Sequence, residues 1–216
     1  MKFFLDTAIR DEIREMTALG MVDGVTTNPS LLKTAAAPYR EVIAEICRMV
    51  DPGPVSAEVL AEDADGMLRE ARTLHTIAPN VVVKIAMGPV GLQVVRALRD
   101  EQIDCNVTLV FSGNQALLAA KAGARYVSPF IGRLDDVGQE GMALIEEILE
   151  IYGNYAFPTE VIVASIRHPM HVSAAARLGA DIATMPTAVL RAMYRHPLTD
   201  AGKQKFLEAW RDVPQR

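Results

Sequence analysis

Short apolar runs alternate with longer amphipathic stretches along almost the whole chain, and this alternation limits the possible folds more than any other feature. The expected strands are Phe3 to Asp6, Gly24 to Asn28, Val55 to Leu60, Val81 to Ala86, Ile103 to Val110, Tyr126 to Phe130, Val161 to Ser165 and Asp181 to Met185. The expected helices are Ala8 to Leu19, Pro38 to Val50, Asp63 to Ile77, Val90 to Asp100, Gly113 to Ala122, Gly138 to Tyr152, Pro169 to Leu178 and Thr187 to Tyr194. Such alternation requires parallel strands joined by right-handed crossovers.

Eight strand–helix units favour an α/β fold that closes as a single (β/α)8 TIM barrel over an open doubly wound sheet. The 216 residues leave about 27 residues for each unit, which is compact. No Gly-x-Gly-x-x-Gly follows any strand, so the main dinucleotide-binding signal is missing. We expect one domain over 1–216, with 198–216 as a C-terminal helical extension. Phe206 and Trp210 lie four residues apart there, and this stripe either covers the barrel or docks on a neighbouring subunit.

Composition excludes several classes of function. No apolar run is long enough for a membrane span, and the acid at Asp6 comes too early for a signal-peptide core. The formal charge of −5, with dispersed basic residues, argues against nucleic-acid binding. Cys47 and Cys105 have no motif spacing and are expected as free thiols in a reducing cytoplasm. His168-x-x-His171 lacks an accompanying carboxylate or cysteine cluster, so no metal site is expected.

Lys84 lies inside the β-branched run Val81 to Ala86, which has the composition of a strand buried on both faces. The chain has six lysines, and the other five lie near the termini or in polar, helix-like segments. A buried ammonium must reach solvent, pair with an acid or lose its proton. Burial favours the neutral amine, which is the nucleophile that Schiff-base chemistry needs. Lys84 is therefore either a structural lysine that reaches the strand end or a candidate nucleophile.

Polar side chains collect where the expected strands end, which is where (β/α)8 barrels place their chemistry. They are Asp6, Thr26, Asn28, Glu58, Lys84, Asn106, Thr108, Ser128, Arg133, Ser165 and Arg167, with Phe130 among them. The eighth strand, ending Ala183-Thr184-Met185-Pro186, offers little. Taken alone, each of these polar side chains is equally consistent with a solvated loop residue. Seven strands that end in polar groups around one lysine nevertheless indicate an enzyme.

The chemical types fit one reaction. A Schiff-base lysine needs a carbonyl substrate and a carboxylate that transfers protons. Glu58, one strand away from Lys84, can be that carboxylate, and Thr108 can hold a water between them. Asp6 can take a proton from a substrate hydroxyl as a carbon–carbon bond breaks. Arginines such as Arg133 and Arg167 suit a phosphate. The residues thus indicate a metal-independent aldolase-type enzyme that acts on a sugar phosphate.

Seven segments resemble the transaldolase family: Phe4 to Thr7, Gly24 to Ser30, Val82 to Ile85, Asn106 to Ser112, Gln115 to Ala124, Val127 to Asp136 and Ala164 to Arg167. The match spans essentially the whole chain and is similar to the short bacterial and archaeal subfamily, which includes the fructose-6-phosphate aldolases. The resemblance implies a (β/α)8 barrel, sugar-phosphate substrates of the pentose phosphate pathway, and no metal or organic cofactor. It also implies a homo-oligomer, a ring-shaped decamer, in which the C-terminal helix around Trp210 reaches a neighbour.

The resemblance also implies roles for individual residues. Lys84 corresponds to the Schiff-base lysine, Glu58 to the proton-shuttling acid, and Asp6 to the base that acts on the C4 hydroxyl. Thr108 corresponds to the residue that holds the catalytic water. The residues implied to bind substrate are Asn28, Asn106 and Ser165 on the dihydroxyacetone part, Arg133 and Arg167 on the phosphate, and Ser128 and Phe130 on the pocket wall, with Thr26 at the same rim.

Two positions separate transaldolases from fructose-6-phosphate aldolases within the resemblance. The aldolases carry glutamine where this chain has Glu58 and tyrosine where it has Phe130. Transfer of dihydroxyacetone to an acceptor aldose is therefore expected, with release of free dihydroxyacetone as the alternative. A third reading is a barrel of reduced activity with a binding role. This hypothesis rests on the segment from Ala86 to Pro89, because the family usually has a proline directly after the residues that match Lys84 and Ile85. We expect Gly88 to make this loop more flexible and Pro89 to be the first residue of the next helix.

Overall fold

A closed barrel of eight parallel strands forms the centre of the computed structural model, which describes residues 1–35 and 37–214. The strands are β1 (Lys2–Asp6), β2 (Gly24–Thr26), β3 (Val55–Glu58), β4 (Val81–Ala86), β5 (Cys105–Val110), β6 (Tyr126–Pro129), β7 (Glu160–Val163) and β8 (Ile182–Met185). Each strand pairs with the next in the sequence, and β1 pairs with β8 to close the ring. The predicted (β/α)8 TIM barrel with an additional C-terminal helix is confirmed.

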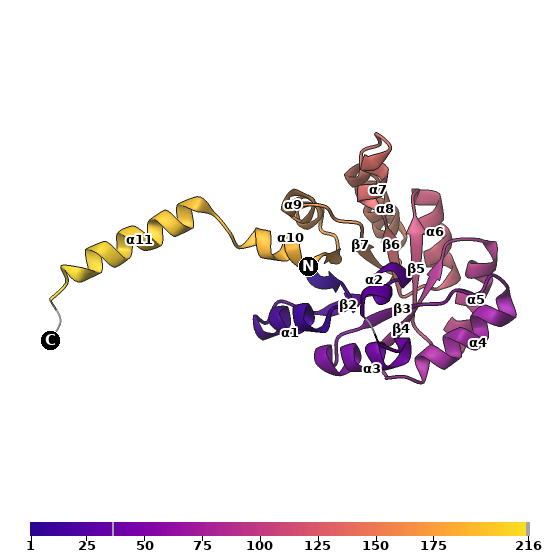
Figure 1. Ribbon diagram of the computed structural model, residues 1–216. Helices are drawn as coiled ribbons and strands as arrows, with labels where there is room; N and C mark the ends of the chain where they lie inside the picture. The colour runs from indigo at the N-terminus through magenta and orange to yellow at the C-terminus, as the bar shows by residue number, and fades with distance from the viewer. Residues whose placement is uncertain (36, 215–216) are drawn as a thin grey trace.

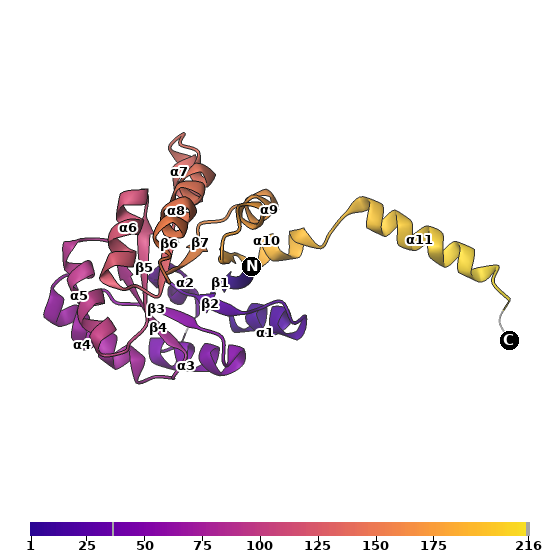
Figure 2. The same ribbon diagram turned by 180° about the vertical axis from the view of Figure 1, so that it is seen from behind.

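Helices surround the strands, as Figures 1 and 2 show from opposite sides. They are α1 (Arg10–Ala18), α2 (Pro29–Leu32), η1 (Lys33–Ala35), α3 (Tyr39–Val50), α4 (Ala64–His75), α5 (Pro89–Asp100), α6 (Gly113–Ala122), α7 (Ile131–Asp136), α8 (Gly141–Tyr155), α9 (Pro169–Leu178), α10 (Thr187–Met193) and α11 (Pro197–Arg211). The sequence missed α2, η1 and α7, which are too short to show a period of 3.6 residues.

The barrel interior changes from apolar to polar along the strands. Phe4, Val82, Tyr126, Ile162 and Ile182 form a separate buried cluster inside the ring. Because side chains of a strand alternate between its two faces, the inward positions two residues later hold Asp6, Lys84, Ser128 and Thr184. The carboxyl ends of the strands therefore present polar groups above an apolar floor.

Gly24 on β2 is required by this packing. A Cβ atom at Gly24 would lie 2.7 Å from the ring of Phe4, closer than real Cβ atoms approach. Phe4 also contacts Tyr126 edge-on, with the ring centroids 6.5 Å apart. The missing side chain on β2 thus lets an aromatic residue fill the ring and support the polar layer above it.

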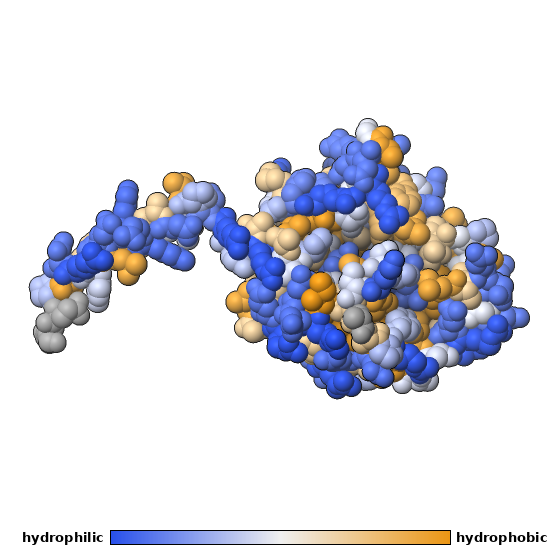
Figure 3. All heavy atoms as spheres, in the orientation of Figure 1, coloured by the Kyte–Doolittle hydropathy of each residue, from blue (hydrophilic) through white to orange (hydrophobic). Residues whose placement is uncertain are grey.

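The C-terminal helix α11 extends away from the barrel rather than covering it (Figure 1). None of its described side chains is buried, and Leu198, Phe206, Leu207 and Trp210 are each more than 60% exposed. Figure 3 shows small orange, hydrophobic patches separated by hydrophilic groups along this helix. Of the two predicted placements for this helix, cover over its own barrel is wrong. Residues 215 and 216 of the predicted extension lie outside the described residues.

No helix among the described residues is both long enough and apolar enough to cross a membrane.

Candidate active site

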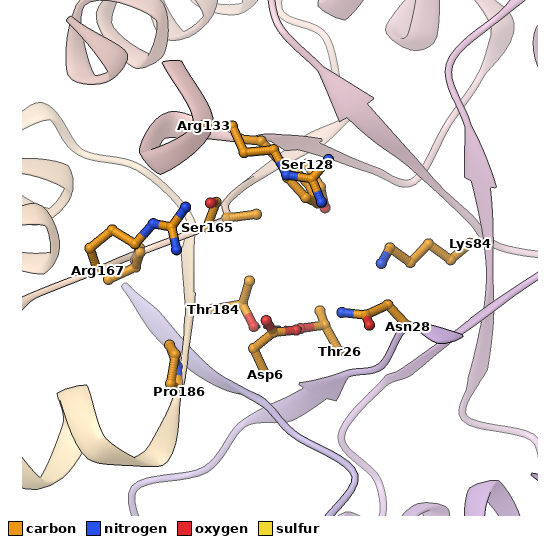
Figure 4. Close-up of a pocket in the computed structure, with 13 residues that line it drawn as sticks. Asp6, Thr26, Asn28, Lys84, Ser128, Arg133, Ser165, Arg167, Thr184 and Pro186 are labelled. Atoms are coloured by element: carbon orange, nitrogen blue, oxygen red, sulfur yellow. Dashed lines mark hydrogen bonds between the residues drawn. The ribbon is translucent and has the colours of Figure 1, made fainter. Parts of the chain in front are cut away.

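A pocket of about 260 Å³ opens at the carboxyl ends of the strands. Its lining consists of Asp6, Thr26, Asn28, Lys84, Ser128, Phe130, Arg133, Ala164, Ser165, Ile166, Arg167, Thr184 and Pro186. Nine residues singled out in the sequence therefore meet in one cavity, although they are spread from residue 6 to residue 167. In Figure 4, Lys84 points into the pocket from one side, and Arg133 and Arg167 lie on the other.

Lys84 is 4% exposed, on the strand next to the one that carries Glu58. The two residues are partners in the parallel register, so their side chains share the inward face. Lys84 Nζ lies 3.1 Å from Glu58 Oε2 and donates a hydrogen bond of 3.0 Å to the carbonyl oxygen of Thr27. An ammonium has three donors, so these two contacts leave one direction for the pocket. This geometry places a buried nitrogen and an acid within proton-transfer distance.

Glu58 does not line the pocket of Lys84; it lines a second cavity, of about 580 Å³. That cavity lies beside α3 and α4, and Tyr39, Leu60 and Leu74 contribute to its mostly apolar wall. The hydroxyl of Tyr39 is buried without a hydrogen bond to any described residue, and burial raises the pKa of this phenol to about 12. Glu58 thus stands between Lys84 and a cavity that the sequence did not reveal.

Asp6 ends a chain of hydroxyl groups. Thr26 donates a hydrogen bond of 2.8 Å to Asp6 Oδ1, and the hydroxyls of Thr26 and Thr184 lie 2.6 Å apart. Since Thr26 has one hydroxyl proton and gives it to Asp6, Thr184 must donate to Thr26. Burial raises the pKa of Asp6, although the bond from Thr26 and the charge of Lys84 oppose that shift. The prediction that the eighth strand offers little was wrong, because Thr184 is buried in the pocket; the period of two from Ile182 could have identified it.

Asn106 and Thr108 lie on β5 but do not line the pocket. Asn106 is fully buried; its Nδ2 donates to Ser56 Oγ at 3.1 Å, and its Oδ1 accepts from Ser128 Oγ at 2.8 Å. Its amide therefore orients Ser128, which does face the pocket. Thr108 Oγ1 is buried and has no hydrogen bond to a described residue. Ser56 was missed in the sequence, although it shares the inward face with Glu58 two residues later.

Asn28 is fixed by the helix that follows it. Its Oδ1 accepts a hydrogen bond of 3.0 Å from the backbone amide of Leu31, so that Asn28 caps α2 while Pro29 occupies the first turn. The cap determines the orientation of the amide: Nδ2 makes no hydrogen bond with a described residue. Asn28 therefore offers a donor at the pocket wall.

The segment after β7 carries Ser165 and Arg167. Ser165 has φ +61°, a left-handed conformation that costs energy for a residue with a Cβ and that concentrates at functional sites. Gly132 of α7 makes room for this bend, because a Cβ there would lie 2.2 Å from the carbonyl oxygen of Ser165 and 2.6 Å from Arg167 Nε. The close approach of α7 and the bend brings both arginines to one rim.

The two arginines differ from Lys84 in being exposed. Arg133 stacks on Phe130, with its Cζ 5.0 Å from the ring centroid. Arg167 Nη2 forms an ion pair of 2.6 Å with Asp136 Oδ2, a partner that the sequence did not indicate. Both guanidinium groups are oriented, and they can bind an anion at the edge of the pocket.

The loop after Lys84 is anchored. Met87 donates its backbone hydrogen bond to the carbonyl oxygen of Thr108 at 2.9 Å, and Pro89 is the first residue of α5, as predicted. Gly88 has φ 166°, which is extended backbone that any residue adopts. The structure therefore gives no backbone reason for glycine at this position.

Among the described residues, no group of three or more His, Cys, Asp or Glu side chains is arranged to hold a metal ion.

Comparison with known proteins gives consistent results for family and fold. The model of the family described as Transaldolase/Fructose-6-phosphate aldolase matches residues 3–214. A probable transaldolase of Methanococcus maripaludis (strain C5) is 62% identical over 210 residues, which is 97% of each chain. A probable transaldolase of Aquifex aeolicus is 58% identical over 216 residues, covering 100% of this chain and 99% of that protein.

A solved structure of a mandelate oxidase mutant with the monooxide FMN adduct has a TM-score of 0.59 at 14% identity. It covers 86% of this chain, and this chain covers 64% of it, less than two thirds. The likeness concerns the fold alone.

Proposed function

The chain belongs to the transaldolase/fructose-6-phosphate aldolase family, and we propose that it is a transaldolase that works through a Schiff base on Lys84. It transfers a dihydroxyacetone unit from a ketose phosphate, such as fructose 6-phosphate or sedoheptulose 7-phosphate, to an aldose phosphate. The observation that carries the proposal is the buried contact of 3.1 Å between Lys84 Nζ and Glu58, beside a pocket that also holds Asp6 and two arginines.

The first step needs a neutral amine and a neutral acid together. A proton that moves from Lys84 Nζ to Glu58 across their contact supplies both at once. The amine then attacks the C2 carbonyl of the donor, and a proton passes from its nitrogen to the new oxygen to give the carbinolamine. The carbinolamine hydroxyl takes the proton of Glu58 and leaves as water, which gives an iminium on Lys84 and returns Glu58 to its carboxylate. The buried Thr108 hydroxyl, without a hydrogen bond to a described residue, suits a residue that holds the water of this proton transfer.

Cleavage of the C3–C4 bond requires a base at the C4 hydroxyl. Asp6 takes that role: burial raises the pKa of its carboxyl group, so its carboxylate is a stronger base than an exposed one. The electron pair of the broken bond passes to the iminium and gives an enamine on Lys84, while the aldehyde half of the donor departs. The enamine then adds to the carbonyl of the acceptor, with Asp6 returning its proton to the new hydroxyl. Water hydrolyses the resulting iminium through the reverse of the first step, which releases the product ketose phosphate and the free amine of Lys84.

Substrate contacts follow from the lining. Asn28, Ser128 and Ser165 have polar atoms at the pocket wall and bind the hydroxyls of the three-carbon unit, and Asn106 acts by orienting Ser128. Arg133 and Arg167 bind the phosphate at the open rim. Phe130 and Glu58 favour transfer over release: a phenyl ring gives the enamine no extra proton donor, so the intermediate waits for an aldehyde.

Borohydride reduction in the presence of fructose 6-phosphate tests the proposal. We expect a three-carbon adduct on Lys84, located by peptide mass mapping, and an activity that EDTA leaves intact. Free dihydroxyacetone is then measured with and without erythrose 4-phosphate. Release as fast as transfer would favour fructose-6-phosphate aldolase activity, and an active enzyme without an adduct at Lys84 would exclude the Schiff base. A protein that neither forms the adduct nor turns over would favour a binding role.

The exposed apolar residues of α11 suit a subunit contact. Since they do not pack on their own barrel, we propose that α11 docks on a second copy of the chain, in the homo-oligomer that the family resemblance implies. Light scattering of the full chain and of a variant that ends at Arg195 tests this. A full chain that is monomeric at micromolar concentration would contradict it.

A further inference from the structure

His171 connects the two segments that carry the arginines. It is the third residue of α9 and is 9% exposed. Its Nδ1 accepts a hydrogen bond of 3.3 Å from the backbone amide of Arg167, and its Nε2 lies 3.2 Å from Asp135 Oδ2 on α7. One ring therefore contacts both the bend after β7 and the helix of Arg133.

These contacts determine the protonation of the ring. A backbone amide can only donate, so Nδ1 must carry a lone pair, and the single ring proton is on Nε2, where it is donated to Asp135. Burial lowers the pKa of His171, and the nearby His168 and Arg167 lower it further, whereas Asp135 acts to raise it. The start of a helix also disfavours a cation. His171 is thus neutral at physiological pH, and both of its nitrogens are engaged.

Helix α7 is held at its two ends by different contacts. At its start, Ile131 donates a backbone hydrogen bond of 3.1 Å to the carbonyl oxygen of Ala164. At its end, Asp135 accepts from His171 through Oδ2 and from the backbone amide of Gly141, at 3.0 Å, through Oδ1. Arg133 lies between these two attachments. Among the described residues, loss of the His171 contacts would leave the end of α7 connected to the arginine-bearing bend by the exposed pair of Arg167 and Asp136, while the start of α7 keeps its bond to Ala164.

We propose that His171 sets the spacing between Arg133 and Arg167 and is thereby a positioning residue for phosphate recognition; this inference rests on the proposed function. A dianion clamped by two guanidinium groups needs them at a fixed separation, and side chains on short helices and loops hold such a separation only when the backbone beneath them is tied. Ser165, strained at φ +61°, stands in the same bend and benefits from the same support.

Two substitutions remove the two bonds separately. In His171→Gln the amide nitrogen can reach Asp135, but no acceptor remains for Arg167. In His171→Asn the amide oxygen takes the place of Nδ1, but the contact with Asp135 is lost. A hydrogen bond contributes about 0.5–1.5 kcal/mol net, so we expect each variant to raise KM for fructose 6-phosphate by roughly two- to tenfold. KM for unphosphorylated fructose should stay within about twofold, and kcat should change less than KM in both cases.

His168→Gln is the matched control. The two imidazole rings contact each other with centroids 3.9 Å apart and planes tilted by 40°, but the His168 side chain makes no hydrogen bond with a described residue. This variant should leave KM for both donors within about twofold of the parent. Equal losses on the two donors in His171→Gln, or the same selective loss in His168→Gln, would show that His171 acts through packing alone and would overturn the proposal.

A double-mutant cycle and a binding measurement complete the test. Asp135→Ala combined with His171→Asn should cost no more than Asp135→Ala alone, since that single change already removes the contact between Asp135 and His171. Calorimetric titration with inorganic phosphate reports the arginine site without turnover, and Kd should rise in His171→Gln. If the parent forms no Schiff base but His171→Gln binds phosphate more weakly than the parent, the proposed function is rejected and this inference stands. Parent-like phosphate binding in His171→Gln, or none in the parent, would reject the inference even in an active transaldolase.

Discussion

Lys84 and Arg167 line the same pocket, but the protein holds them in different ways. Lys84 comes from the middle of a strand, is 4% exposed, and contacts Glu58 and the Thr27 carbonyl. Arg167 comes from a bend after β7, its side chain is about half exposed at 52%, and its partner Asp136 is similarly exposed at 58%. Lys84 and Arg167 lie on opposite sides of the pocket in Figure 4, so the pocket has a buried half around Lys84 on the strands and an exposed half around the arginines on α7 and the bend after β7.

The difference matches what the proposed function requires of each half. Covalent chemistry needs the reacting atoms to lie within a few tenths of an ångström of their productive positions, and side chains on strands in a packed interior meet this requirement. Phosphate binding needs charge that can be released from its resting partner at low cost. An exposed ion pair contributes about 0–1 kcal/mol, so Arg167 can exchange Asp136 for a phosphate almost freely. Four substitutions test this contrast, beginning with the largest expected effect.

Lys84→Met should abolish turnover, by more than about 10⁴-fold, because the nucleophile is lost while the shape of the side chain is nearly kept. The variant should also lose the borohydride adduct and remain folded by circular dichroism. Lys121→Met on α6 is the matched control and should keep parent activity, since Lys121 is exposed and outside the pocket. Residual turnover of a few per cent in Lys84→Met would place the chemistry elsewhere.

Thr26→Val removes the hydroxyl that donates to Asp6 at nearly constant shape. A hydrogen bond to a charged group contributes about 1.5–3 kcal/mol, so kcat should fall roughly 10- to 100-fold. That bond lowers the pKa of Asp6, so its loss should move the acidic limb of the kcat profile to higher pH. Asp6 must be ionised to act as a base, hence activity is lost as the pH falls through its pKa. Thr184→Val should have a smaller effect, because Thr184 reaches Asp6 only through Thr26. Equal effects would indicate that the Thr–Thr contact itself is essential.

Arg167→Ala tests the exposed half. Removal of one guanidinium from a clamped dianion should raise KM for fructose 6-phosphate by about 10- to 100-fold, from charge-assisted bonds of roughly 1.5–3 kcal/mol. KM for unphosphorylated fructose should be nearly unchanged. Steady-state kinetics on both donors give the answer, and an equal loss on both would assign Arg167 a structural role.

Asp136→Asn should have the smallest effect, and in the opposite direction. Removing the resting partner of Arg167 leaves the guanidinium free for phosphate, so KM for fructose 6-phosphate should fall, by about fivefold at most. Asp100→Asn is the control, because Asp100 forms a similarly exposed pair with Arg99 at 2.6 Å, outside the pocket. A rise in KM for Asp136→Asn would mean that Asp136 orients Arg167 rather than competing for it.

The buried half was easier to predict from the sequence than the exposed half. Lys84 stands out because a charge in a β-branched run is rare, and Glu58 stands out because it is an acid on the neighbouring expected strand. The exposed half depends on α7, which has six residues and no detectable period, and on a bend with a left-handed serine. Neither has a local signal: serine rarely adopts a positive φ, and it does so here because the surrounding structure imposes it.

The sequence by itself determined the order of the strands and of the longer helices, the closed barrel and the family, since periodicity and motifs are properties of neighbouring residues. Tertiary structure alone decided the contacts between distant residues. Thr26 meets Thr184 across 158 positions only because β8 closes on β1, and Glu58 gains a second cavity only because α3 and α4 pack beside it. The hydrogen-bond partners of His171 and the outward direction of α11 were decided in the same way. Hydrogen bonds and burial depend on which surfaces the fold brings together, and that information is not contained in any one segment of the chain.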